Sequence, residues 1–130
     1  MRAKNISLMG MTILTLMCFI VPVLACPPPG HSPGYWKHQF NATYFGKGKP
    51  HQTQANLEMW TMNINTYYGM TPPTYEGYTL TAVSDLDYDM DGDFDLDDTL
   101  GIFNDPKWNK MWNPLANWYN YKAGLAPYLN

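Results

Sequence analysis

Residues 85–98 read Asp-Leu-Asp-Tyr-Asp-Met-Asp-Gly-Asp-Phe-Asp-Leu-Asp-Asp, and they hold most of the acidic residues of the chain. Eight of its fourteen residues are aspartate, and none is lysine or arginine. Carboxylates this close together repel one another, so the segment either stays extended in water or folds around a cation.

The alternating aspartates match a twelve-residue calcium loop that begins at Asp87. Such a loop takes its ligands from positions one, three, five, seven, nine and twelve, and glycine at position six allows a sharp turn. Gly92 falls on position six, and Phe94 falls on position eight, where an apolar side chain packs beneath the loop. The predicted metal ligands are therefore Asp87, Asp89, Asp91, Asp93, Asp95 and Asp98.

The ligands do not all bind in the same way. Position seven binds through its backbone carbonyl, so the side chain of Asp93 is not required, whereas the other five bind through carboxylates. We expect Asp85 and Asp97 to lie outside the ligand set. Calcium is the favoured ion because it accepts about six to eight oxygen ligands in irregular geometry, whereas magnesium demands a tight octahedron.

Residues 87–103 resemble an EF-hand-type loop, and in particular a dockerin loop, in which aspartate at position twelve is followed by a short helix. The resemblance implies calcium binding and contact with a protein partner. The chain departs from the dockerin pattern because it carries one such loop instead of two, and because Thr99 stands where an apolar residue is usual. A solvated acidic linker is the alternative interpretation, which the placement of Gly92 and Phe94 disfavours.

The N-terminal segment, residues 1–25, is typical of a secretory signal peptide. Arg2 and Lys4 precede a nearly uncharged apolar run, and Ala25 offers a small residue at the cleavage point. A retained membrane anchor is the alternative, since the run is close to the minimum length for a membrane span.

Cleavage after Ala25 would leave Cys26 as the only cysteine, because Cys18 lies in the signal. An intramolecular disulfide is then impossible, and a bound metal is one common substitute in a small secreted domain. We expect membrane contact only through an uncleaved signal or a lipidated Cys26. The six lysines and eleven acidic residues after position 25 leave a formal charge of −5 and form no basic stretch, so nucleic acid is not an expected partner.

Residues 26–34 are rich in proline and glycine and predict an extended linker. The sequence His-Ser-Pro-Gly-Tyr-Trp-Lys-His follows from His31 and is similar to the opening motif of a group of secreted microbial proteins of uncharacterised function.

Several helices are expected beyond the linker. Leu57, Trp60 and Ile64 share one face of a helix over residues 54–68, with Thr53 as its N-cap and Gly69 at its end. A short helix carries the four-three spacing of Leu96, Leu100 and Phe103. Two further helices should begin at the pairs Asp105-Pro106 and Asn113-Pro114, and the second should end at Gly124 with Leu125 packed on the cap.

The abundant aromatic residues have two interpretations. Trp60, Trp108 and Trp112 fall at helical core spacing, so we expect them in the core, where large rings bury much apolar area. Tyr35, Trp36 and Tyr121 stay open as candidates for an exposed sugar-binding or protein-binding face. Neither a nucleophile motif nor a carboxylate pair outside the loop indicates catalysis, so we expect no enzyme.

These observations predict a mainly α fold, a small helical domain organised around one EF-hand-like calcium loop. The expected divisions are residues 1–25 as signal peptide, 26–34 as linker and 35–130 as a single calcium-stabilised domain. The expected function is a non-catalytic, secreted or cell-surface calcium-binding module for protein contact or self-association. A carbohydrate-binding module and a structural subunit of a surface assembly are the alternatives.

Overall fold

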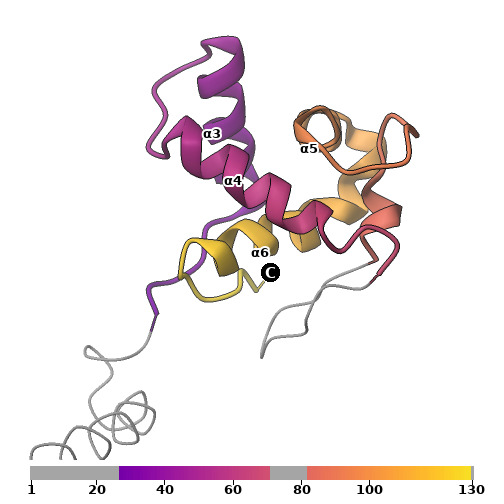
Figure 1. Ribbon diagram of the computed structural model, residues 1–130. Helices are drawn as coiled ribbons and strands as arrows, with labels where there is room; N and C mark the ends of the chain where they lie inside the picture. The colour runs from indigo at the N-terminus through magenta and orange to yellow at the C-terminus, as the bar shows by residue number, and fades with distance from the viewer. Residues whose placement is uncertain (1–26, 71–81, 130) are drawn as a thin grey trace, which may run out of the picture.

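The computed structural model describes residues 27–70 and 82–129, and it is mainly helical, with no strand in those two ranges. Figure 1 shows the arrangement of the described helices, whose buried apolar residues form one core. The predicted signal peptide, Cys26 and its lipidation lie outside the described residues.

The first described helix, α3 (Pro33–Phe45), was not predicted. It begins inside the expected linker, so the prediction that Pro33 and Gly34 belong to an extended tether is wrong. The Ser32 hydroxyl caps the helix by accepting a bond from the Tyr35 N–H, and proline is tolerated at the first helical position because its missing N–H has no helical partner there. Trp36 and Phe40 lie on the buried face.

The helix α4 (Gln54–Asn65) confirms the prediction for its start and its buried face. The Thr53 side chain accepts a bond from the Asn56 N–H, as expected of an N-cap, and Leu57, Trp60 and Ile64 are buried. The helix ends at Asn65, earlier than the predicted residue 68, and turns carry the chain on to Met70.

A short 3-10 helix, η1 (Val83–Leu86), leads into the acidic loop, and α5 (Leu96–Asn104) leads out of it. The helix α5 confirms the predicted short helix. Its N-cap is Asp95, which together with Asp98 forms a reciprocal capping box: each side chain accepts a bond from the backbone N–H of the other residue.

The C-terminal part contains η2 (Pro106–Met111) and α6 (Trp112–Lys122). Asp105 caps η2 as predicted, but α6 already begins at Trp112, so the predicted start at Asn113-Pro114 is wrong. Pro114 is the third residue of the helix, within the first turn, where no N–H donor is required.

The end of α6 confirms the predicted glycine cap. Gly124 adopts φ 77°, its N–H donates to the Tyr121 carbonyl over 3.1 Å, and the Leu125 N–H donates to the Asn120 carbonyl over 2.8 Å. These two bonds define a Schellman motif, which satisfies carbonyls left open at the helix end.

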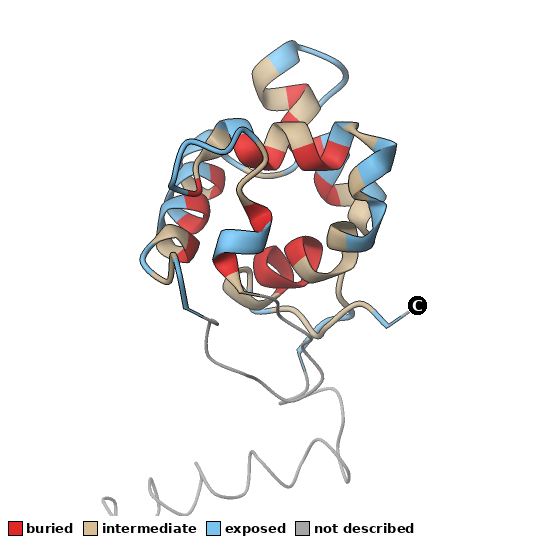
Figure 2. Ribbon diagram, turned by 90° about the vertical axis from the view of Figure 1, so that its right-hand side faces the viewer, coloured by how far each residue is buried: buried red, intermediate tan, exposed pale blue. Residues whose placement is uncertain are grey.

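The core lies between the inward faces of α3, α4, α5 and α6, and Figure 2 shows the buried residues on those faces. The Tyr119 ring is fully buried, 5.6 Å from the Trp36 ring and 5.0 Å from the Phe40 ring. Its hydroxyl bonds to the hydroxyls of Thr61, at 2.7 Å, and Thr99, at 3.0 Å. One tyrosine therefore joins α4, α5 and α6 through a neutral buried network.

The residues before α3 are bonded to the end of the chain. The Asn120 side chain accepts from the N–H groups of His31 and of the Trp36 indole, both at 2.9 Å, and donates to the His31 carbonyl. The Ala126 N–H donates to the Pro28 carbonyl over 2.8 Å. Residues 28–32 are thus fixed against the C-terminal segment.

Within residues 27–70 and 82–129, no helix combines the length and the apolar character needed to cross a membrane.

Candidate metal centre

The acidic loop is held at both ends by helical structure. Asp87 directly follows η1, and Asp95 caps α5, so the carboxylates of the loop lie between two fixed points. Phe94 is 1% exposed and belongs to the core, which anchors the loop from beneath as predicted for position eight.

Backbone N–H groups of the loop turn inward and donate to its carboxylates. The two oxygens of Asp87 accept from the N–H groups of Asp91, at 3.2 Å, and Gly92, at 3.0 Å. The side chains of Asp89 and Asp91 accept from residues two positions further on. Gly92 has φ 89°, a left-handed conformation that favours glycine, which explains the glycine at position six.

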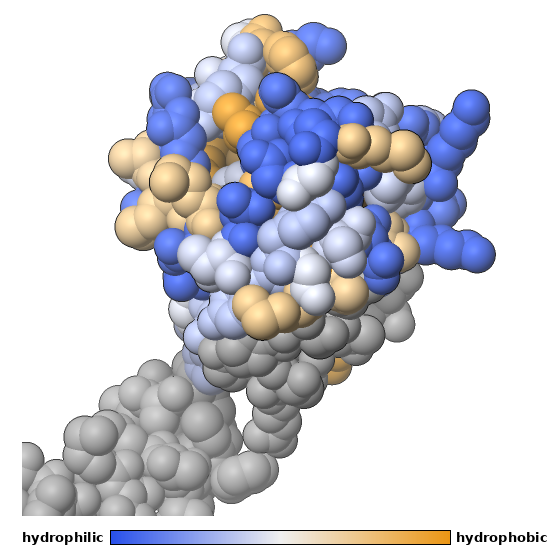
Figure 3. All heavy atoms as spheres, turned by 45° about the vertical axis from the view of Figure 1, so that its right-hand side comes forward, coloured by the Kyte–Doolittle hydropathy of each residue, from blue (hydrophilic) through white to orange (hydrophobic). Residues whose placement is uncertain are grey.

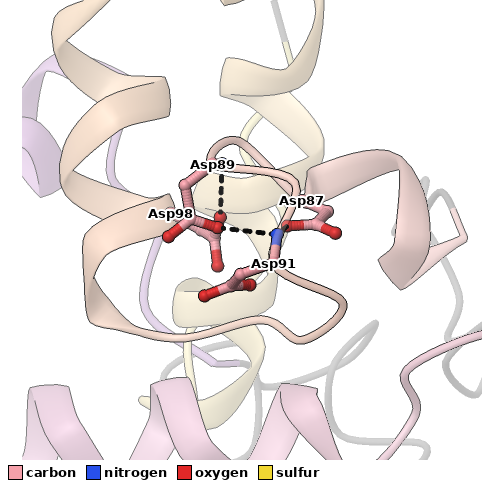
Figure 4. A group of neighbouring side chains, drawn as sticks. All are labelled: Asp87, Asp89, Asp91 and Asp98. Carbon is pink, nitrogen blue, oxygen red and sulfur yellow. Dashed lines mark hydrogen bonds between the residues drawn. The ribbon is translucent and has the colours of Figure 1, made fainter.

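Four carboxylates converge on one point. Asp87, Asp89, Asp91 and Asp98 each bring an oxygen within 4.8 Å of the others, and Figure 4 shows these side chains gathered inside the loop. Asp98 reaches the group from the first turn of α5, whereas the other three come from the loop. A hard cation with oxygen ligands fits such a set, because every donor atom is a carboxylate oxygen.

The remaining predicted ligands belong to overlapping groups. Asp93 and Asp95 lie within the same 4.8 Å limit of Asp91 and Asp98, so all six predicted positions border the same region. Asp97, predicted to lie outside the set, forms a third group with Asp89 and Asp95. Asp85 belongs to η1.

Asp98 is the buried member, with no exposed surface. Its Oδ1 accepts from the N–H groups of Tyr88, at 2.7 Å, and Asp89, at 3.2 Å, and its Oδ2 accepts from the Asp95 N–H at 2.8 Å. Burial raises the pKa of the Asp98 carboxyl to about 7, against the stabilising effect of these N–H donors. In the absence of a cation this carboxylate is therefore costly to keep charged.

Among the other carboxyls of the loop, some have a raised pKa and others a lowered one. A hydrogen bond shared with Asp91, together with burial, raises the pKa of Asp93 to about 6, and burial and the same neighbour raise the pKa of Asp89. The pKa of Asp87 is lowered, since bonds from Tyr68, Gly92 and Asp91 outweigh its burial. Like charges at short range force some carboxyls of the group to keep a proton unless a cation replaces it.

Two residues of the site were not predicted: Asn65, the last residue of α4, and Tyr68, in the turn that follows. The Asn65 side chain accepts from the Phe94 N–H over 2.7 Å, and the Tyr68 hydroxyl donates to Asp87 Oδ2 over 2.8 Å. The bond to Asp87 raises the pKa of Tyr68 to about 12. These contacts span 29 and 19 positions of sequence, so no local pattern could have indicated them.

The aromatic residues left open by the sequence lie largely inside. Trp36 is 0% exposed, so it cannot serve as an exposed sugar-binding ring, and Tyr35 and Tyr121 are half-buried. Of the residues expected in the core, Trp60 is buried, whereas Trp108 and Trp112 pack against the core half-buried.

Comparison with protein-family models, with curated proteins and with solved structures found no match to this chain.

Proposed function

We propose that the protein is a calcium-binding, non-catalytic module whose loop of residues 87–98 holds one Ca²⁺ and whose fold depends on that ion. The observation that carries the proposal is the convergence of Asp87, Asp89, Asp91 and Asp98 within 4.8 Å of one another. Asp95 and the backbone carbonyl of Asp93 would complete the set, in line with the resemblance of the loop to EF-hand and dockerin loops.

The burial of Asp98 supports the proposal independently of the number of aspartates. A carboxylate without exposed surface, beside several others, is destabilising as an anion without a counter-charge. A divalent cation supplies that charge, removes the repulsion within the loop and stabilises the start of α5, where Asp98 is bonded.

The proposed role, contact with a protein partner, depends on the surface that the loop forms with its neighbouring helices. The loop is bonded to Asn65 at the end of α4 and to Tyr68 in the turn after it. The ion would therefore fix α4, the loop and α5 as one surface for contact with a protein. The apolar N-terminal run and the small residue Ala25 support a location outside the cell or at its surface.

Terbium luminescence tests the proposal, because Tb³⁺ replaces Ca²⁺ at oxygen sites and Tyr88, within the loop, can sensitise its emission. We expect one equivalent of Tb³⁺ to bind and Ca²⁺ to displace it. Asp89→Asn should weaken binding about a hundredfold, since it removes a carboxylate ligand. Asp85→Asn is the matched control, because it removes the same charge from η1 and should bind nearly normally. Equal binding by both variants would refute the ligand assignment, and no binding by the unaltered protein would refute the function.

A further inference from the structure

We propose that the protein forms a two-fold symmetric dimer in which the end of α3 of each copy enters a pocket between α4 and the acidic loop of the other. The inference extends the proposed function, because it names the partner surface and a second copy of the chain as its occupant.

The pocket has a volume of about 300 Å³ and combines apolar and acidic walls. Its apolar side includes Met62, which is 70% exposed, together with Phe94 and Leu96. Its acidic side chains are Glu58, Asp93 and Asp95, of which Glu58 lies outside the proposed calcium ligands, and no lysine, arginine or histidine lines it. Such a pocket suits an apolar group that carries a positive charge beside it.

Glu58 is held in place at the rim of the pocket. Its Oε2 accepts from the Gln54 side chain over 3.0 Å and from the Tyr44 hydroxyl over 2.9 Å. These bonds lower the pKa of Glu58, so it carries its charge at neutral pH. A carboxylate fixed before binding loses less side-chain freedom when a cation arrives.

The end of α3 offers the complementary group. Phe45 is 54% exposed, and the Lys47 ammonium lies 5.9 Å from the centre of its ring. Gly46 ends the helix with φ 65°, so these two side chains flank a tight turn where α3 stops. We call Phe45, Gly46 and Lys47 the α3 tip. Figure 3 shows that hydrophobic residues on the face drawn there occur in small separate groups among hydrophilic ones. An apolar contact on that face would therefore be small and local, as the α3 tip is.

The tip and the pocket lie next to each other on one copy, which favours a closed dimer. Tyr44 precedes the tip directly and is bonded to Glu58 of the pocket. Two complementary surfaces side by side can pair reciprocally across a two-fold axis, so each copy gives its tip and receives the tip of the other. In such a dimer every tip and every pocket is occupied, so none is left to bind a third copy.

Calcium favours this contact in two ways: it fixes the loop that forms one wall of the pocket, and it reduces the negative charge of each copy. The loop forms one wall and α4 forms the other. The bond of Asn65 joins the loop to α4, and the bond of Tyr68 joins it to the turn after α4. Each copy carries a formal charge of −5 over residues 26–130, from six lysines and eleven acidic residues, and bound calcium reduces the repulsion between copies.

Sedimentation velocity of the purified full chain, in calcium and in EGTA, tests the proposal. We expect a monomer–dimer equilibrium in calcium and a shift toward monomer in EGTA. Phe45→Ser, Lys47→Glu and Glu58→Lys should each weaken the dimer at least about tenfold, because each alters an exposed group at the contact. Lys110→Glu, in η2, makes the same charge change as Lys47→Glu away from the contact and should leave the dimer intact.

Mixing two variants gives the decisive result. Lys47→Glu alone and Glu58→Lys alone bring like charges together in both contacts of a dimer, whereas the mixed pair brings opposite charges together in both. The mixture should recover the dimer. Failure of recovery, an effect of Lys110→Glu equal to that of Lys47→Glu, or oligomers larger than the dimer would overturn the proposal.

Calcium binding is measured by titration calorimetry on the same samples, which separates the two proposals. A calcium-loaded protein that stays monomeric overturns the dimer and leaves the calcium module standing. A protein that binds no calcium refutes the proposed function, and a dimer that then persists and responds to the Phe45 and Lys47 variants would support the contact alone.

Discussion

The acidic loop and the aromatic core differ in the groups that surround their buried polar side chains. In the core, Tyr119 and Asn120 are fully buried, and their polar atoms meet neutral partners on α3, α4 and α5 or in the segment before α3. In the loop, Asp98 is equally buried, but it lies within 4.8 Å of other carboxylates. The chain itself supplies partners for Tyr119 and Asn120, whereas the loop contains no positively charged side chain to offset its carboxylates.

The stability of the protein should depend on pH and calcium mainly through the loop. Neutral hydrogen bonds in the core respond little to pH or calcium, because neither partner gains or loses a proton near neutral pH. Crowded carboxylates respond to both, because a proton or a cation can relieve their repulsion. The core should therefore contribute a part of the free energy of unfolding that is nearly independent of pH and calcium, and the loop a part that changes with both.

Calcium removal should give the largest effect. A ligand that binds only the folded state stabilises it by about 4 kcal/mol when its concentration is a thousandfold above Kd. We therefore expect EGTA to lower the free energy of unfolding by about this amount at millimolar calcium and a micromolar Kd, as measured by urea denaturation. An unchanged midpoint would show that the loop does not require the ion.

Asn120→Ala should give the next largest effect, and the same effect with and without calcium. The substitution leaves the buried indole N–H of Trp36 and the partly buried backbone groups of His31 without their hydrogen-bond partner. Unsatisfied buried groups cost roughly 1–3 kcal/mol each, so we expect a loss of about 3 kcal/mol in urea denaturation. Asn109→Ala, at an exposed position in η2, should cost little. A loss that appears only in EGTA would contradict the independence of the core.

The pH dependence should distinguish the two regions next. The folded state raises the pKa of Asp98 to about 7 and of Asp93 to about 6, both above the usual 3.8, so the folded apo protein binds protons more tightly than the unfolded chain. Their contribution to apo stability is therefore fully present below about pH 4 and is lost as pH rises through about 6 and 7. We expect the Tm of metal-free protein to fall between pH 5 and pH 8.

Calcium should reverse this trend, because the ion competes with protons for the same oxygens. The stabilisation by calcium should thus be larger at pH 8 than at pH 5. Asp98→Asn should weaken the pH dependence of the apo protein and abolish calcium stabilisation together, as followed by thermal unfolding. An apo protein that becomes more stable from pH 5 to pH 8 would contradict the assignment of the raised pKa values.

The sequence predicts the local features of both regions well. The aspartate register brings together Asp87, Asp89, Asp91 and Asp98, and Thr53, Asp105 and Gly124 cap helices as expected, since each feature depends on residues only a few positions apart. The helix α3 was missed because its prolines and glycines indicated a linker. Its signal was nevertheless present, since Ser32-Pro33 is the same capping device as Asp105-Pro106.

Contacts between distant segments could not be predicted. The Asn120 side chain meets Trp36 across 84 positions, and Asn65 meets Phe94 across 29. A polar residue on a helix face shows no preference in sequence between solvent and a buried partner, so these pairings depend on how the helices pack. Trp36 illustrates the same limit, because its burial depends on the rings and the amide that surround it.

Tyr68→Phe should give the smallest of these effects, confined to the loop. The substitution removes the hydroxyl that donates to Asp87 Oδ2 over 2.8 Å but keeps the ring, so the fold should persist. Substitution of residues that orient metal ligands commonly lowers metal affinity by about tenfold or more. We therefore expect Tyr68→Phe to bind calcium about tenfold more weakly in titration calorimetry. Tyr67→Phe is the matched control, because its ring lies 6.2 Å from Trp118 on the core side and should leave calcium affinity unchanged. Equal affinity of the two variants would show that the Tyr68 hydroxyl does not orient a ligand of the ion. Weaker binding by Tyr68→Phe alone would show that the turn after α4 orients Asp87, in addition to the support that α4 gives through Asn65.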